Sequence, residues 1–166
     1  MAKNANLHTA KAAKNDEFYT RYEDIQKELN FYKGFFKDKI VYCNCETFCK
    51  KDNKGNDRVS EFWNFFTNHF EDFGLKKLIS SSFNENGHGK MWVYEGDKNG
   101  NNEVDEWEIT KTDLNGNGDF RSEECVEILK QCDVVVTNPP FSLFREYVAQ
   151  IMKYGKKFLI IGHQNA

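Results

Sequence analysis

The fold is decided by one stretch, Asp133-Val-Val-Val-Thr-Asn-Pro-Pro-Phe141. Its first part, residues 133–137, is apolar and β-branched, which is typical of a strand buried on both faces of a sheet. The two prolines then end the strand, because neither has a backbone N–H to donate to a neighbouring strand. Ser142 is predicted to cap the next helix, whose apolar residues follow helical spacing from Leu143 to Ile151. A strand, a rigid turn and a helix in this order indicate an α/β fold, which binds its ligand where the strands end.

The turn after this strand presents three groups that suit one kind of ligand. Asn138 has an amide oxygen that accepts hydrogen bonds, and the carbonyl of Pro139 is not committed to a strand ladder. Phe141 adds a flat apolar ring. Two acceptors beside a ring suit a planar base that carries an exocyclic amino group. The alternative is a rigid strand end in which Asn138 is only a turn residue.

Several blocks along the chain, taken in order, resemble one known family. They are KNDEFYT at 14–20, VYCNC at 41–45, GDFRS at 118–122 and FSLFREY at 141–147. Together with the Asn-Pro-Pro-Phe motif, this set resembles the EcoRI-type adenine-specific DNA methyltransferase family. The resemblance runs from about Lys14 to the last residue, and the ordered set is far more specific than the four-residue motif.

The resemblance implies a catalytic role for Asn138, Pro139, Pro140 and Phe141. Methyl transfer to an aromatic amino nitrogen is difficult because the nitrogen lone pair is delocalised into the ring. If the amino group donates hydrogen bonds to Asn138 and to the Pro139 carbonyl, its nitrogen becomes more tetrahedral. No strong base is required, since the proton can leave after the attack. The base must first leave the duplex, and Phe141 would then stack on it.

The same resemblance implies S-adenosylmethionine as the cofactor. A dinucleotide-type fold normally has a glycine-rich turn after its first strand, and the turn at 43–46 has no glycine. That turn alone would argue against this cofactor, but the family uses a similar Cys-Asn-Cys-acid block. Glu46 is expected to pair with the amino group of the methionine moiety, and Asp119 with the cofactor's adenine. Alternatively, Phe18 and Tyr19 of the 14–20 block are ordinary core residues that do not contact the cofactor. The predicted cofactor-binding residues are Phe18, Tyr19, Thr20, Cys43, Asn44, Cys45, Glu46, Asp119 and Phe120.

The other segments complete a doubly wound, Rossmann-like methyltransferase sheet. Helices are predicted at 25–36 and 62–73, because apolar residues recur there at helical spacing, and Gly74 is expected to end the second. Strands at 39–44 and 77–83 flank that second helix, which makes the strand–helix–strand unit of a parallel sheet. The order of strands in the family places the 39–44 strand centrally, beside the 133–137 strand.

An insertion is predicted at about 84–118. Its strands at 91–94 and 107–110 are joined by a Gly/Asn/Asp-rich stretch, as in a hairpin. After the insertion, Ser122 is expected to cap a short helix, and 158–161 is the last predicted strand.

A calcium-binding module is the rival interpretation of part of the insertion. Residues 113–124 satisfy the EF-hand pattern, and residues 97–108 match it with Asn102 in place of the glycine. The two loops start too close together for an intervening helix pair, and 107–112 alternates like a strand. Asp119 also belongs to a methyltransferase block. We therefore predict no metal.

Composition narrows the class of protein. The chain has 166 residues, of which 39% are hydrophobic and 15% aromatic, as expected for one globular domain. No apolar run is long enough for a membrane span. Residues 1–13 are polar and are predicted to be a frayed start, which leaves 14–166 as the catalytic domain. The net charge of −3 gives no support to DNA binding by the chain as a whole.

The five cysteines are an odd number without a signal sequence, which predicts free thiols and a cytoplasmic protein. Zinc binding by Cys43, Cys45 and Cys49 is the alternative, but the spacing is not that of paired ligands and no fourth ligand lies nearby. Buried thiols are the preferred interpretation.

The sequence is therefore interpreted as an incomplete catalytic domain of an adenine-N6 DNA methyltransferase from a restriction-modification system, with double-stranded DNA as partner. Transfer to RNA or to a protein glutamine is an alternative, because release-factor glutamine methyltransferases carry a similar Asn-Pro-Pro motif. Another is a truncated remnant that binds cofactor or nothing. The family's sheet continues beyond the 158–161 strand, so we expect an exposed sheet edge and a homodimer formed through it.

Overall fold

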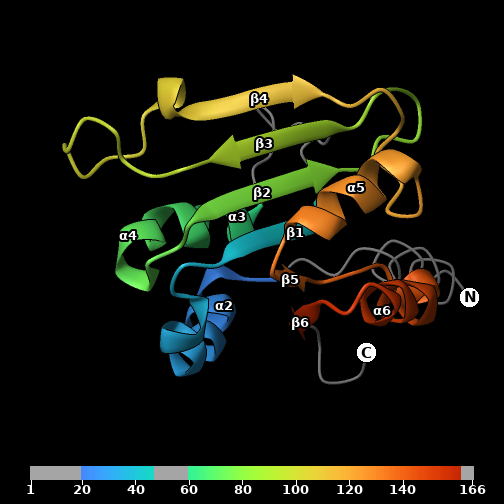
Figure 1. Ribbon diagram of the computed structural model, residues 1–166, viewed down its shortest axis with the longest axis horizontal. Helices are drawn as coiled ribbons and strands as arrows, with labels where there is room; N and C mark the ends of the chain where they lie inside the picture. Colours follow the sequence, from blue (N-terminus) through green and yellow to red (C-terminus); the bar gives the residue numbers. More distant parts are fainter. Residues whose placement is uncertain (1–19, 47–59, 162–166) are drawn as a thin grey trace, which may run out of the picture.

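The computed structural model describes residues 20–46 and 60–161, and its centre is one mixed sheet (Figure 1). The described strands follow the order β4-β3-β2-β1-β5-β6. β1, β2, β5 and β6 are parallel, whereas β3 and β4 run antiparallel to their neighbours. The central place of β1, beside β5, is as predicted. The strands are β1 (Ile40–Glu46), β2 (Lys77–Ser82), β3 (Lys90–Tyr94), β4 (Ile109–Asp113), β5 (Val134–Thr137) and β6 (Lys157–Ile160).

Helices cover both faces of this sheet, which confirms the doubly wound α/β class. One face packs against α2, η1, α3 and α4, and the other packs against α5 and α6. In Figure 1, α5 and α6 lie in front of the sheet and α3 lies behind it. The helices are α2 (Tyr22–Leu29), α3 (Glu61–Asn68), α4 (Phe70–Phe73), α5 (Glu123–Gln131) and α6 (Phe144–Lys153), with 3-10 turns η1 (Asn30–Phe36), η2 (Glu106–Glu108) and η3 (Phe141–Leu143).

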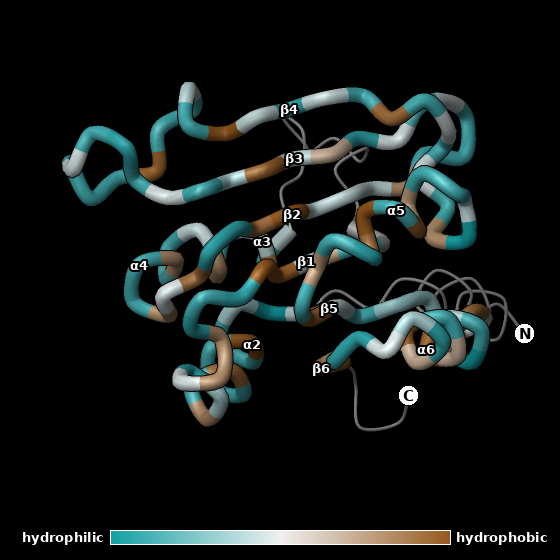
Figure 2. Tube along the Cα trace, in the orientation of Figure 1, coloured by the Kyte–Doolittle hydropathy of each residue, from teal (hydrophilic) through white to brown (hydrophobic). Residues whose placement is uncertain are grey.

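The strand period of two divides the core into two clusters. Val41 and Cys43 of β1 point to the side of α3, and Tyr42 between them points to the side of α5. The first cluster is dominated by phenylalanines, with Phe36 and Phe66 rings 5.6 Å apart. Each fully buried ring of this kind contributes about 1.5–3 kcal/mol of hydrophobic stabilisation. Figure 2 shows hydrophobic residues along the central strands and hydrophilic ones along much of the β3–β4 connection.

Three helix ends behave as local chemistry dictates. The Ser122 hydroxyl accepts from the backbone N–H of Cys125 at 3.2 Å, as predicted for an N-cap. Ser60 does the same for α3 by accepting from Phe62 at 3.1 Å. Gly74 ends α4 in the left-handed conformation, with φ of 66°.

The predicted N-cap at Ser142 is wrong. The Leu143 N–H donates to the Pro140 carbonyl at 3.1 Å, which closes a 3-10 turn around Ser142. An N-cap needs an extended backbone at the entry of the helix, and Ser142 is already inside a turn. The helix α6 instead begins at Phe144, and the residue before it makes no side-chain cap.

Other elements also differ from the prediction, and the helix predicted at 62–73 is divided at His69 into α3 and α4. The helix predicted at 25–36 is α-helical only to Leu29 and continues as a 3-10 turn containing Gly34, a poor helix former. The strand predicted at 107–110 begins at Ile109, because Asp105 and Glu108 form a capping box around η2.

The insertion is a β-hairpin that extends the sheet. β3 pairs with β2, and β4 pairs with β3 from Lys90 opposite Asp113 to Tyr94 opposite Ile109. The insertion therefore adds two antiparallel strands to the parallel ones.

Among the described residues, Cys43, Cys125 and Cys132 are buried, and Cys125 and Cys132 are free thiols. Burial raises the pKa of the Cys132 thiol to about 12, so this thiol stays protonated at neutral pH. The prediction of free thiols is confirmed for Cys125 and Cys132. None of the described helices combines the length and apolar character needed to cross a bilayer.

Candidate active site

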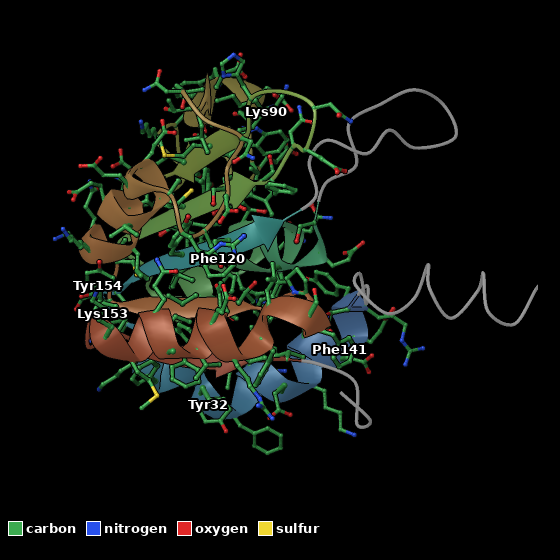
Figure 3. The ribbon with its side chains drawn as sticks, turned by 90° about the vertical axis from the view of Figure 1, so that its right-hand side faces the viewer. Tyr32, Lys90, Phe120, Phe141, Lys153 and Tyr154 are labelled. Carbon is green, nitrogen blue, oxygen red and sulfur yellow. The ribbon has the colours of Figure 1, made fainter. Side chains whose placement is uncertain are left out.

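Two of the polar residues predicted for the site, Asn44 and Asn138, lie at the carboxyl ends of the parallel strands β1 and β5, on the right in Figure 1. Figure 3 looks at this edge of the sheet, with Phe120 and Phe141 on the side that faces the viewer. Thr137, the last residue of β5, lies opposite Ile160 of β6. Its hydroxyl donates to the carbonyl of Asn44 in β1 at 2.6 Å, and this contact is buried. The strand ends that carry the predicted residues are therefore joined directly.

Asn138 is held by a residue from the start of the described chain. Its Nδ2 donates to the Oγ1 of Thr20 at 3.0 Å. The Thr20 hydroxyl in turn donates to the carbonyl of Ile161 at 3.5 Å. Thr20 was predicted to bind the cofactor, and in the structure its hydroxyl contacts the predicted catalytic asparagine. The aromatic members of that block, Phe18 and Tyr19, lie outside the described residues.

The other residues of the turn differ in their exposure to solvent. Pro139 is buried and Pro140 is half-buried. Within the described residues the Pro139 carbonyl accepts no hydrogen bond, whereas the Pro140 carbonyl accepts from Leu143. The Phe141 ring is 38% exposed. An acceptor and an open aromatic face therefore stand at the same edge of the sheet.

Asn44 carries a buried acceptor at the end of the central strand. The residue is 5% exposed, and its Oδ1 has no hydrogen-bond partner among the described residues. A buried polar atom without a partner costs about 1–3 kcal/mol, which makes this oxygen a candidate acceptor for a ligand donor. The neighbouring Cys43 carbonyl accepts from the Ser80 hydroxyl at 3.1 Å. The side chains of Cys45 and Glu46 lie outside the described residues.

The loop before Asp119 packs against the end of β2. Asn84 donates its backbone N–H to the Asn117 carbonyl at 2.8 Å. Gly118 has a φ of 83°, and a Cβ at this position would lie 1.9 Å from the Ser82 carbonyl oxygen. Only glycine fits there, and its close approach puts Asp119 beside the end of β2. The sequence analysis missed this use of glycine, although the glycine pair around Asn117 was its visible signal.

Asp119 is engaged by a neighbouring cation. Arg121 donates to both carboxylate oxygens of Asp119, at 3.0 and 2.8 Å, and also to Glu146 of α6 at 3.0 Å. The hydrogen bonds from Arg121 lower the pKa of Asp119. The carboxylate is therefore ionised at neutral pH and is fixed in orientation, and a ligand amino group would have to share it with Arg121.

Phe120 is a core residue. It is 5% exposed, and its ring lies 5.2 Å from that of Tyr147 in an edge-to-face arrangement. Its carbonyl accepts from the Gln150 amide at 3.0 Å. These contacts join the 118–122 block to α6, the helix that follows the turn at 138–141. They give Phe120 a structural role beside the predicted cofactor role.

In the loops that match the EF-hand pattern, Asp97, Glu108 and Glu124 accept backbone N–H groups of their own loop. Asp97 accepts backbone N–H groups from Asn102 and Gly100, both at 2.7 Å, and these bonds lower its pKa. The buried Glu108 accepts from the backbone N–H groups of Lys98 and Asp105. In the part of the chain that the structure describes, no group of three or more His, Cys, Asp or Glu side chains is arranged to hold a metal.

Comparison with known proteins identifies the family of the chain. The family model described as "Adenine-specific methyltransferase EcoRI" matches residues 6–166. The type II methyltransferase M.EcoRI of Escherichia coli is 46% identical over the whole chain, which covers 52% of that relative. M.MpnI of Mycoplasma pneumoniae is 44% identical over 96% of the chain, which covers 44% of it. M.MgeORF184P of Mycoplasma genitalium is 40% identical over 94% of the chain, which covers 43% of that relative.

The chain thus spans about half the length of these curated relatives. No solved structure matches it. The family match extends over nearly all of the sequence, and the described structure joins Asn138 to Thr20 and Thr137 to Asn44. The chain belongs to the EcoRI-type family of adenine-specific methyltransferases.

Proposed function

We propose that this chain forms the catalytic edge of an S-adenosylmethionine-dependent methyltransferase that modifies the N6 position of adenine in double-stranded DNA, as part of a restriction-modification system. The observation that carries the proposal is the turn after β5. Its Asn138 amide is anchored by Thr20, and the exposed ring of Phe141 stands in the same turn.

The chemistry follows from the groups of the turn. The Asn138 Oδ1 and the Pro139 carbonyl would accept the two N–H groups of the target amino group. This draws the nitrogen lone pair out of conjugation with the ring. Phe141 would stack on the base after it has left the duplex, and a partly exposed ring is available for that contact.

The buried acceptor of Asn44 supports the cofactor assignment. Its Oδ1 lacks a donor among the described residues, and S-adenosylmethionine carries ammonium, hydroxyl and amino donors. When bound, this cofactor supplies the methyl group as an electrophile. Asn44 would hold one of its donors at the end of β1, and Asp119 would hold another beside the end of β2.

Phe144 and Arg145 form a small rim beside the turn, and this rim suits contact with DNA. Phe144 is 43% exposed, and Arg145 next to it is exposed and makes no ion pair within residues 20–46 and 60–161. An arginine in this setting is available to a phosphate. The net charge of −3 does not favour phosphate binding over the whole surface, so we place the DNA contact at this rim. A protein that modifies cellular DNA in this way would act in the cytoplasm.

The test is methyl transfer by the natural protein that contains residues 1–166. Duplex DNA is incubated with labelled cofactor, and N6-methyladenine is measured by mass spectrometry. Asn138→Ala should lower the rate by ~100-fold or more, because it removes an acceptor used in the transition state. The exposed Asn30 in η1 gives a matched control, and Asn30→Ala should leave the rate unchanged. Full turnover by the Asn138 variant, or methylation of a protein glutamine in place of DNA, would overturn the proposal.

A homodimer through β6 is the second part of the proposal. β6 pairs with β5 on one side, and within the described residues no strand pairs with its other side. An open edge with the 40% exposed Phe158 can pair with the same edge of a second copy. Sedimentation at micromolar concentration should show a dimer. Phe158→Lys should dissociate it, whereas Phe31→Lys on η1 should not, and a monomeric wild-type chain would refute this part.

A further inference from the structure

The Thr20 hydroxyl links the catalytic turn to the end of β6. It accepts a hydrogen bond from Asn138 Nδ2 at 3.0 Å and donates one to the Ile161 carbonyl at 3.5 Å. The first contact joins residues that are 118 positions apart in the sequence. Thr20 is half-buried, so this link is partly shielded from competing water.

The two contacts of Thr20 determine which way the Asn138 amide faces. An asparagine amide can rotate by half a turn, which exchanges its oxygen acceptor with its nitrogen donor. The Ile161 carbonyl has no proton to give, so the Thr20 proton must point to it. The lone pairs of the hydroxyl then face Asn138 and can only accept. The amide nitrogen is selected on that side, and the amide oxygen is held on the other.

We propose that Thr20 is a positioning residue that fixes the amide orientation of Asn138. The inference rests on the proposed function for its catalytic consequence, because only an oxygen aimed at the target base can accept from an amino group. In the opposite orientation the amide would present N–H groups to N–H groups. Thr20 then acts through Asn138 and needs no contact of its own with the cofactor.

The test uses a variant that removes the hydroxyl of Thr20 and keeps the shape of its side chain. Thr20→Val is close to isosteric but can neither accept from Asn138 nor donate to Ile161. Thr20→Ser keeps both abilities. The exposed Thr110 of β4 supplies the control variant Thr110→Val.

The first measurement is the NMR spectrum of the Asn138 side-chain amide in the 166-residue chain, assigned by its loss in Asn138→Ala. Thr20→Val should shift this signal strongly and bring its two protons closer together in frequency. Thr20→Ser and Thr110→Val should leave it near the wild-type position. An unchanged signal in a folded Thr20→Val chain would overturn the proposal, and backbone amide dispersion reports whether the variant is folded.

The second measurement is steady-state methyl transfer by the natural protein that contains this chain. Thr20→Val should lower kcat about 10-fold with KM for cofactor and DNA within about twofold, and Thr20→Ser should restore kcat. A raised KM for cofactor with unchanged kcat would show Thr20 to be a cofactor contact and would overturn the positioning role. If wild type shows no methylation, the proposed function fails. The NMR measurement then still decides the orientation of Asn138, because it needs no turnover.

Discussion

The turn after β5 and the loop between β3 and β4 both gather polar side chains, but different forces hold them. In the loop at 97–108, Asp97 and Glu108 accept from backbone N–H groups two to ten residues away. In the turn, Thr137 and Asn138 reach partners 93 and 118 residues away. The acids of the loop are therefore held mainly by local bonds, although the Asp97 backbone N–H also donates to the Glu71 carboxylate of α4 at 3.2 Å. The turn exists only when the sheet has brought distant segments together.

The strongest test of this difference uses two glycines with similar backbone conformations. Gly118 and Gly100 have φ of 83° and 78°, but only Gly118 has a backbone atom where a Cβ would lie. Gly118→Ala should lower the free energy of unfolding by about 2–5 kcal/mol, from strain in the left-handed conformation plus overpacking. Gly100→Ala should cost about 1–2 kcal/mol, from the conformation alone.

Urea denaturation of both variants measures this prediction. Equal losses for Gly118→Ala and Gly100→Ala would mean that the close approach to β2 adds nothing. The end of β2 would then not be the support for Asp119.

The second test removes hydrogen bonds within the 97–108 loop and leaves the turn after β5 unchanged. Glu108 is 3% exposed and accepts from Lys98 at 2.7 Å and Asp105 at 3.2 Å. Glu108→Gln turns one acceptor into a donor that faces N–H groups, and it should cost about 1–3 kcal/mol. Glu106→Gln is the control, because that side chain is exposed and its ion pair with Lys111 contributes about 1 kcal/mol or less.

Thermal denaturation compares the two glutamate variants. Affinity for S-adenosylhomocysteine should be the same in both, because the loop does not form the site. A loss of cofactor affinity in Glu108→Gln would contradict the separation of the two regions.

The smallest expected effect is that of calcium on stability. Asp97 of the 97–108 loop and Glu124 of the 113–124 stretch already accept backbone donors, so the ion would have to displace those bonds. The melting temperature measured in millimolar calcium should equal the melting temperature measured in the presence of a chelator. A bound ion at a hundredfold excess over its Kd would add about 2.7 kcal/mol. A rise of several degrees that Asp113→Ala abolishes would revive the calcium interpretation.

Much of the fold could be predicted because it is encoded locally. The run at 133–137 has the composition of a buried strand, and β5 forms there. Ser122 and Gly74 mark the helix ends by their own side-chain and backbone chemistry. The predicted cap at Ser142 failed because the neighbouring Pro140 starts a 3-10 turn, a competition between two local rules.

The contacts of the site could be predicted only in part. The sequence points to Asn138, but its partnership with Thr20 depends on where the sheet places residues that are far apart in the chain. The burial of Phe120 against Tyr147 is likewise a result of packing. A motif shows which residues matter, whereas the structure shows which of them touch each other.

The most direct test of the central claim is a titration of the labelled chain with S-adenosylhomocysteine, followed by amide chemical shifts. The account predicts that Thr20, Asn44 and Asn138 shift together, because they lie at one edge of the sheet, and that residues 97–108 do not shift. Shifts confined to the 97–108 loop, or spread over the surface without Asn44 and Asn138, would contradict it.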